Sequence, residues 1–437
     1  MSATVDEIVI FWFRRDLRLE DNAGLWHALT SGYKVVPVFI YDSNILSMLE
    51  PDDARISFLR DILEGINKAL KNAGSSLLTI SGTPTEVFKN LSNRYVIKGL
   101  YFNRDYEPYA IERDNSITDY FKNLGIACYS YKDQVIFERN EVIKSDGKPY
   151  TVFSPYSKKW LSLFDSSLIS PYPSGTLLNN LAKIPDLTYF TPEKIGFKSP
   201  AMKVKIPVLD PTHISEYGRA RDIPSLDGGS YLGPHLRFGT ISIRDVFRRT
   251  ENANRVFTNE LIWREFFMQI LFHFPSVINN SFRPEYDRIL WVNNEEHFSK
   301  WCEGKTGFPF IDAGMRELKE TGYMHNRVRM VVANFLTRHL LTDWRWGEAW
   351  FASKLLDYEL SSNNGNWQWS AGTGCDAAPY FRIFNPDLQV KKFDRDLTYI
   401  KKWIPEFGTE DFPSPIVDHS LARERALKFY KEGIRSL

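Results

Sequence analysis

The sequence predicts an α/β N-terminal domain with a Rossmann-like parallel sheet, followed by an all-α C-terminal domain. Three observations support this fold class. Short apolar runs alternate with helical patterns early in the chain, helical periodicity dominates after about residue 206, and the length of 437 residues exceeds what one ordinary core supports. We therefore predict an α/β domain at 1–132, a connector at 133–205 and a helical domain at 206–437.

Five apolar runs in the first domain have the length and composition of strands. They are Ile8–Phe13, Val35–Tyr41, Leu77–Ile80, Gly99–Phe102 and Ala127–Tyr129. Between the second and third runs, apolar residues recur every three or four positions, which predicts an amphipathic helix. These residues are Ile56, Leu59, Leu63, Ile66 and Leu70, with start signals at 51–53 and a stop signal at Gly74.

The connector is predicted to be irregular because prolines interrupt it. They are Pro149, Pro155, Pro171, Pro173, Pro185 and Pro192. Beyond the connector, strand signals nearly vanish and the apolar spacing becomes helical. The clearest helical patterns cover 256–274, 313–321 and 327–341.

Bulk composition limits the classes of function. With 55 Lys and Arg against 54 Asp and Glu, the formal net charge is +1, so any nucleic-acid-binding face must be a local basic patch. The three cysteines form no metal-ligand spacing with histidine, which predicts a reduced, cytoplasmic protein without a metal site. No signal peptide and no apolar run of membrane-spanning length is present, so no membrane association is expected.

Two loops bear on cofactor binding. The first strand runs into FRRDLRLEDN rather than GxGxxG, so the α/β domain alone does not predict the main cofactor site. The segment DGGSYLG at 227–233 presents successive backbone N–H groups before a helical pattern, which suits a phosphate. An ordinary turn is the alternative interpretation of that segment.

The segment NELIWREFF at 259–267 places a carboxylate, an indole and a guanidinium on one helix face. Glu260, Trp263, Arg264 and Phe267 follow the i, i+3, i+4, i+7 pattern. An intrahelical ion pair beside a core tryptophan is one interpretation. A wall that stacks on and hydrogen-bonds a nucleic-acid base is the other.

Two further segments are unusually polar for a helical domain. MHNRVRM at 324–330 adds Arg327 and Arg329 to Arg219, Arg221 and Arg264, which indicates a local basic patch or a solvated charged face. The segment at 355–386 mixes acids, asparagines and tryptophans with small residues. Such polar groups need partners when buried, and a polar cofactor ring would provide them.

These stretches resemble the photolyase/cryptochrome family, and within it the class I cyclobutane pyrimidine dimer (CPD) DNA photolyases. The matching segments are FWFRRDLRLEDN (11–22), EYGRARD (216–222), NELIWREF (259–266), GKTGFPFIDAGMREL (304–318), MHNRVRM (324–330) and NNGNWQWSAGTGCDAAPYFRIFNP (363–386). The resemblance implies a helical FAD-binding domain and light-driven electron donation from reduced FAD to a flipped-out dimer in UV-damaged DNA.

The resemblance also implies roles for individual residues. The implied catalytic residues are Glu260, Trp263, Met330, Asn363 and Trp369, with Asn363 facing flavin N5. The implied FAD contacts are Tyr217, Gly229, Ser230, Tyr231, Leu232, Gly233, Phe257, Arg264, Asp357, Tyr358, Glu359 and Asn363. The implied DNA contacts are Arg221, Glu260, Trp263, Arg264, Phe267, Asn326, Arg327 and Trp369. The implied electron-transfer chain is Trp291, Trp344 and Trp367.

The sequence favours repair over signalling within the family. The alternative within the family is a blue-light-sensing cryptochrome. Three features oppose it: Trp263 and Trp369 are both present, Asn363 is not Asp, and no long tail follows the last helical pattern. A (6-4) photolyase is less favoured because Met330 stands where that branch has histidine. A dark flavoprotein oxidoreductase and a non-enzymatic DNA-binding module are the alternatives from other classes.

The family also suggests a second chromophore. Tyr109 and Ala110 stand where folate-binding members carry Asn and Glu, so a deazaflavin or flavin antenna is favoured over folate in the N-terminal domain. The protein is expected to act on DNA as a monomer and to associate with the bacterial nucleoid through its substrate.

Overall fold

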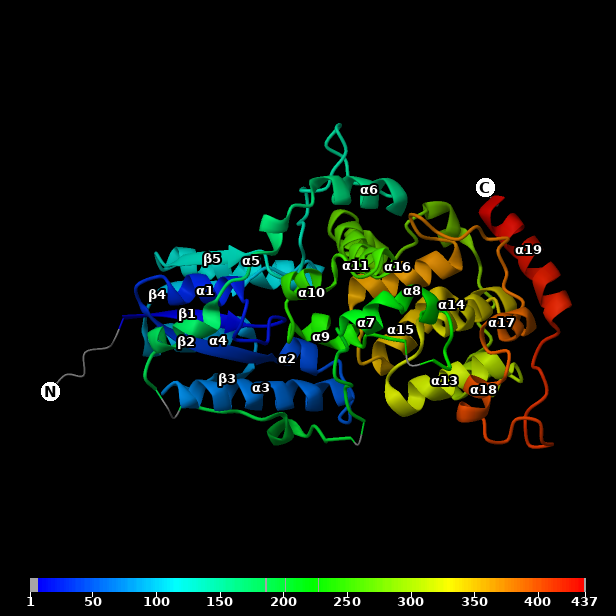
Figure 1. The fold of residues 1–437 in the computed structure, drawn as a ribbon, viewed down its shortest axis with the longest axis horizontal. Helices are drawn as coiled ribbons and strands as arrows, with labels where there is room; N and C mark the ends of the chain where they lie inside the picture. Colours follow the sequence, from blue (N-terminus) through cyan, green and yellow to red (C-terminus); the bar gives the residue numbers. More distant parts are fainter. Residues whose placement is uncertain (1–6, 185–186, 201, 227, 436–437) are drawn as a thin grey trace. The chain divides into compact units, whose positions relative to one another are not determined.

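The structure is a computed structural model that describes residues 7–184, 187–200, 202–226 and 228–435 (Figure 1). Two compact units are present, each assembled from three stretches of chain. The first unit contains Met1–Glu141, Leu163–Lys205 and Leu232–Arg249, and the second contains Val142–Ser162, Ile206–Tyr231 and Thr250–Leu437. Pro185 and Asp227, which the sequence analysis used, lie outside the described residues.

This division interleaves along the chain, whereas the sequence analysis expected continuous domains. Residues 232–249 pack with the first unit although they fall inside the predicted helical domain. The predicted connector is shared between the two units and contains helix α6 (Phe153–Leu163). The domain boundaries drawn from the sequence stay a prediction.

The first unit contains a five-stranded parallel sheet in the order β3-β2-β1-β4-β5. The strands are β1 (Glu7–Phe13), β2 (Lys34–Asp42), β3 (Leu78–Gly82), β4 (Val96–Asn103) and β5 (Ala127–Tyr131). All five predicted strands are therefore confirmed. Val9 of β1 pairs in register with Val35 of β2 and Gly99 of β4, which makes β1 the central strand.

Alternating side chains of the strands cover both faces of the sheet with apolar residues. Val9, Phe11 and Phe13 pack under α1 (Ala23–Leu29) and α3 (Ala54–Asn72). On the opposite face, apolar residues of the same strand pack with α4 (Pro84–Arg94) and α5 (Pro108–Asn123). The remaining helices of this unit are α2 (Ser43–Leu46), α9 (Leu232–Phe238) and α10 (Ile243–Thr250).

Helix α3 forms as the apolar spacing predicted. Its buried residues are Ile56, Leu59, Leu63, Ile66 and Leu70. The carboxylate of Asp53 accepts a hydrogen bond from the backbone N–H of Arg55 at 2.9 Å and caps the first turn. Gly74 follows the helix with φ of 76°, a left-handed conformation that glycine adopts without a steric cost.

A buried ionic network ties separate stretches of the first unit together. Asp133 accepts hydrogen bonds from Arg18 at 2.7 Å and from Arg244 at 2.9 Å. Arg244 and Arg248 of α10 also bond to the carboxylate of Asp21, at 2.9 and 2.8 Å. Burial by itself raises the pKa of Asp133, but the two arginines outweigh it and hold the pKa below its ordinary value. Ion pairs thus connect the FRRDLRLEDN motif to helix α10.

The second unit is helical, and every named strand of the described residues lies in the first unit. Its helices, besides α6, are α7 (Pro211–Ser215), α8 (Tyr217–Ala220), α11 (Arg255–His273), α12 (Glu295–Glu303), α13 (Pro309–Thr321), α14 (Asn326–Asn334), α15 (Trp344–Lys354), α16 (Leu360–Ala371), α17 (Pro386–Phe393), α18 (Thr398–Trp403) and α19 (His419–Arg435). The predicted fold class is confirmed. Within the described ranges, no helix is long and apolar enough to cross a membrane.

One predicted helix differs from the structure. The pattern at 327–341 was expected to form a single α-helix, but α14 ends at Asn334 and a π-helical turn covers Phe335–His339. The π-helical turn bonds residues five apart instead of four, and it covers only a single turn. Apolar periodicity does not reveal so short a change in hydrogen bonding.

Replacing Asp133 by Ala is expected to lower the free energy of unfolding of the first unit by about 3–5 kcal/mol, because two buried guanidinium groups lose their shared carboxylate. Chemical denaturation followed by circular dichroism measures this loss. Glu7→Gln is the control, because it removes an exposed ion pair with Lys98 in the same unit and should leave the unfolding curve unchanged. Coincident curves for Asp133→Ala and the wild-type protein would contradict the prediction.

Candidate cofactor and nucleic-acid site

Helix α16 packs against both α11 and α15, and two glycines allow this close approach. A Cβ atom at Gly365 would clash with the ring of Phe267 on α11. A Cβ atom at Gly347 of α15 would clash with the indole of Trp367 on α16. The three helices that carry many of the predicted site residues are therefore closely packed through α16, which lies beside α11 in Figure 1.

Asn363 of α16 has both of its amide hydrogens engaged by one residue of α15. Its Nδ2 donates to Glu348 Oε1 at 2.8 Å and to the Glu348 backbone carbonyl at 3.1 Å. Burial raises the pKa of Glu348, and the bond from Asn363 lowers it in part. The sequence analysis missed Glu348, although it lies in the helical segment between Trp344 and the 355–386 stretch. The amide of Asn363 is consequently fixed with its carbonyl oxygen pointing away from Glu348.

Two acidic residues before α16, the half-buried Asp357 and the buried Glu359, form ion pairs with arginines. Asp357 Oδ2 accepts from Arg329 at 2.8 Å, while Asp357 Oδ1 is buried without a hydrogen-bond partner among the described residues. Glu359 accepts from Arg264 at 3.2 Å and from the Ser362 hydroxyl at 3.1 Å. A buried acceptor that lacks a donor costs free energy, so Asp357 Oδ1 is suited to an N–H group of a bound cofactor ring.

The residues near the start of α11 form an aromatic and ionic group. Tyr217 of α8 meets the ring of Phe257 edge-on, with ring centroids 5.2 Å apart. Arg221 lies over the Tyr217 ring and forms an ion pair with Glu260 of α11. Burial, with Glu260 nearby, raises the pKa of Tyr217 to about 12, so this hydroxyl remains a donor at neutral pH.

The predicted phosphate loop leads into α9. Gly228 lies so close to Ala220 that a Cβ atom there would overlap the alanine side chain. Ser230 accepts a backbone hydrogen bond from Val208 at 2.8 Å. Tyr231 has φ of 51° and packs edge-on against Tyr323 at 5.7 Å between ring centroids. Leu232 and Gly233 form the first residues of α9, as the helix predicted after this loop requires.

The tryptophans predicted to contact a base lie on helices in contact with each other. Trp263 of α11 and Trp369 of α16 are both half-buried, and Met330 of α14 is also half-buried. Asn326, the first residue of α14, is exposed. Phe267 is 6% exposed, so its ring supports the crossing of α11 and α16.

The predicted electron-transfer tryptophans occupy different depths. Trp344 and Trp367 are buried, whereas Trp291 is half-buried beside Tyr430 and Phe429 of α19. In the described part of the chain these three rings do not stack on one another. The ring neighbours of Trp367 are Trp301 and Phe351, at 6.2 and 5.0 Å between centroids.

The arginines of the predicted basic patch all form ion pairs with carboxylates. The pairs are Arg219–Glu216, Arg221–Glu260, Arg264–Glu359, Arg327–Asp222 and Arg329–Asp357. A DNA phosphate that binds one of these arginines would therefore share the guanidinium group with a carboxylate. This pairing could not be predicted from helical spacing, because four of the five pairs join residues far apart in the sequence.

His325 is a further residue that the sequence analysis quoted but gave no role. Its Nδ1 accepts from the backbone N–H of Arg327 at 3.2 Å and caps α14, which carries Asn326, Arg327 and Met330. Burial lowers the pKa of His325 to about 4, so the ring is neutral and its Nδ1 is free to accept.

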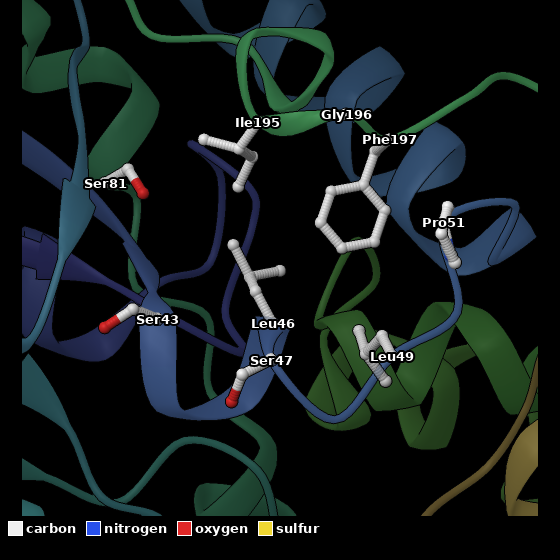
Figure 2. A pocket seen from close by; sticks show the side chains of 9 residues that line it. All are labelled: Ser43, Leu46, Ser47, Leu49, Pro51, Ser81, Ile195, Gly196 and Phe197. Atoms are coloured by element: carbon white, nitrogen blue, oxygen red, sulfur yellow. The ribbon is translucent and has the colours of Figure 1, made fainter.

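A separate pocket of about 340 Å³ lies in the first unit, where β2 and β3 end. Its lining residues are Ser43, Leu46, Ser47, Leu49, Pro51, Ser81, Ile195, Gly196 and Phe197. Figure 2 shows the side chains of Leu46, Ile195 and Phe197 directed into it, with Ser43 and Ser81 on one side. Ligands of parallel sheets bind beyond the carboxyl ends of the strands, and this pocket has that position.

Comparison with known proteins identifies the family. Residues 257–410 match the FAD binding domain of DNA photolyase, and residues 9–174 match the DNA photolyase family. A deoxyribodipyrimidine photo-lyase of Synechococcus is 34% identical, and the match covers 97% of this chain and 96% of that protein. The chain belongs to the photolyase/cryptochrome family. It is an FAD-binding enzyme of DNA repair, and the predicted enzyme class, deoxyribodipyrimidine photo-lyase, is confirmed.

Two solved structures of photolyases share the complete fold. A class III photolyase from Agrobacterium tumefaciens is 32% identical with a TM-score of 0.88, and the match covers 100% of this chain and 99% of that one. An archaeal photolyase from Sulfolobus tokodaii with two FAD molecules is 33% identical with a TM-score of 0.81, covering 98% and 100% of the chains. The predicted class I assignment stays a prediction, because the Agrobacterium relative is a class III enzyme.

Lowering the pH from 7 to 4 is expected to destabilise the protein partly through His325. The folded-state pKa of about 4 lies below the ordinary 6.5, so the unfolded chain takes up the proton first and stability is lost as the pH falls through this window. His325→Asn keeps a capping acceptor that does not titrate. The free energy of unfolding of the wild-type protein, relative to this variant, should fall by roughly 3 kcal/mol between pH 7 and 4. Parallel pH profiles of unfolding would disprove this assignment.

Proposed function

We propose that this protein splits cyclobutane pyrimidine dimers in DNA, using light absorbed by reduced FAD. The observation that carries the proposal is the packing of α11 against α16. Trp263 and Glu260 lie on α11, and Trp369 and Asn363 lie on α16. Relatives that match nearly the whole chain are named for cleavage of deoxyribodipyrimidines. Repair of this kind needs a base-binding wall next to the cofactor, and these helices supply the residue types for both.

The chain's own residues would recognise the lesion after it leaves the duplex. A dimer pairs poorly, so extruding it costs less than extruding an intact base. The rings of Trp263 and Trp369 would each stack on a pyrimidine face, while Glu260 and Asn326 would hydrogen-bond the base edges. Arg221 and Arg327, already oriented by Glu260 and Asp222, would bind the neighbouring phosphates.

The polar groups around α16 would hold the cofactor. Bound FAD supplies the electron that opens the dimer. Asp357 Oδ1 would accept an N–H of the flavin or adenine ring, because it is buried and lacks a donor. The carbonyl oxygen of Asn363, fixed by Glu348, would face flavin N5 as a neutral acceptor. The loop at 229–233 would bind the phosphates, and Trp291, Trp344 and Trp367 would carry electrons to the flavin.

We further propose that the pocket in Figure 2 binds an antenna chromophore. Its apolar wall suits a flat ring, and the Sulfolobus relative contains two FAD molecules, so a flavin or deazaflavin is favoured over folate. Action as a monomer, and a cytoplasmic location near the nucleoid, stay predictions from the sequence.

The proposal is tested with purified protein carrying fully reduced FAD and oligothymidine that contains dimers. Thymine absorbance should recover under blue light and not in the dark. Absence of recovery from the illuminated, FAD-loaded protein would refute dimer repair. In that case, photoreduction of the flavin without repair would favour the cryptochrome alternative, and repair restricted to a (6-4) photoproduct would favour that branch.

Trp369→Ala is expected to weaken binding of dimer-containing DNA roughly 10- to 100-fold, because one stacking surface is lost, with a smaller loss for undamaged DNA. Trp369→Phe keeps an aromatic face and should retain most of the affinity. Fluorescence anisotropy in the dark measures both dissociation constants. Equal losses for damaged and undamaged DNA would reject a stacking role for Trp369.

A further inference from the structure

The stretch Val142–Ser162 is hydrogen-bonded to two buried side chains of α11. The sequence analysis placed this stretch in a connector, yet it packs with the second unit. Trp160 donates from Nε1 to Glu265 Oε2 at 2.6 Å, and Gln269 donates to the Val142 carbonyl at 2.9 Å. Trp160 and Glu265 are both buried, so these bonds fix α6 relative to α11 at the level of Trp263.

Phe153, the first residue of α6, is stacked on Trp263. The two ring centroids lie 3.7 Å apart and the ring planes differ by 6°. Phe266 contacts the Phe153 ring edge-on, with ring centroids 5.9 Å apart. Carbon atoms about 3.5–4.0 Å apart are in van der Waals contact, so the Phe153 ring prevents the indole from tilting toward it.

The same residue is bonded to the loop that follows Trp369. The backbone N–H of Phe153 donates to Asp376 Oδ2 at 2.9 Å. Asp376 lies seven residues after Trp369, whose carbonyl accepts a backbone hydrogen bond from Ala378 at 3.2 Å. The ring of Phe153 therefore contacts Trp263, and its backbone is bonded to the loop that follows Trp369.

We propose that Phe153 is a positioning residue for lesion recognition. Phe153 covers one face of Trp263, and Phe266 and Phe267 lie 5.5 and 5.3 Å from the indole between ring centroids. A pyrimidine would stack on the part of the half-buried indole that these rings leave exposed. An indole held on one side cannot tilt away when the dimer enters, so less freedom is lost on binding. This inference rests on the proposed function, because it assigns Phe153 to the same base-binding wall.

The experiment compares Phe153→Ala with Phe153→Tyr, which keeps the stacked ring. Dissociation constants are measured in the dark for a duplex with one thymine dimer and for the undamaged duplex. Selectivity is the dissociation constant of the undamaged duplex divided by that of the dimer-containing duplex. This ratio should fall roughly three- to tenfold in Phe153→Ala and stay within about twofold of wild type in Phe153→Tyr. In a Trp263→Ala background, Phe153→Ala should cause no further loss, because the two residues act as one.

The outcomes separate this inference from the proposed function. A wild-type protein that does not prefer the dimer refutes the function itself. A wild-type preference that Phe153→Ala leaves unchanged overturns the inference alone, and so does a loss that persists in the Trp263→Ala background. Tighter dimer binding by Phe153→Ala also overturns it, because Phe153 would then occupy the face that the base needs.

A structural effect is distinguished by measuring FAD content and thermal unfolding in parallel. Phe153→Leu is the second variant if Phe153→Ala does not fold, because leucine keeps most of the volume but has no ring to stack. Reduced selectivity in Phe153→Leu with normal FAD content supports the positioning role. Normal selectivity in that variant overturns it.

Discussion

The close approach of α16 to its neighbours is the constraint on which the proposed site depends. A helix can lie this near to two others only where side chains are absent at the crossing points, and Gly365 and Gly347 provide those gaps. Phe267 and Trp367 fill the space that the glycines leave. Any larger residue at either crossing would move α16 away and separate Asn363 from Glu348.

Buried charge is handled in the same way in both units. In the first, Asp133 and Asp21 form ion pairs with buried arginines, which gives the FRRDLRLEDN motif a structural role. In the second, Glu359 and Asp357 are paired with Arg264 and Arg329. Removing either partner of such a pair leaves an uncompensated charge. The free energy lost on removing one partner therefore exceeds the net stabilisation that the intact pair provides.

The second unit combines rigid supports with several buried polar atoms that lack a hydrogen-bond partner among the described residues, and Asp357 Oδ1 is a carboxylate oxygen among them. Trp263 is fixed by Phe153, Asn363 by Glu348, and α14 by the neutral ring of His325. Asp357 Oδ1, by contrast, is a buried acceptor that no described residue satisfies. Supports of this kind would keep the proposed site residues in place before a ligand binds, and Asp357 Oδ1 would accept a hydrogen bond from the proposed cofactor.

The sequence alone determined the five strands, helix α3 with its five buried residues, and the helical character of the second unit, because hydrophobic periodicity reports local structure directly. Its motifs also determined the family. Tertiary structure decided what lies opposite each motif, such as Glu348 beside Asn363, Phe153 on Trp263 and α10 bonded to Asp21. Spacing along one helix cannot reveal these partners, because each comes from another helix or from a distant stretch that only folding brings into contact.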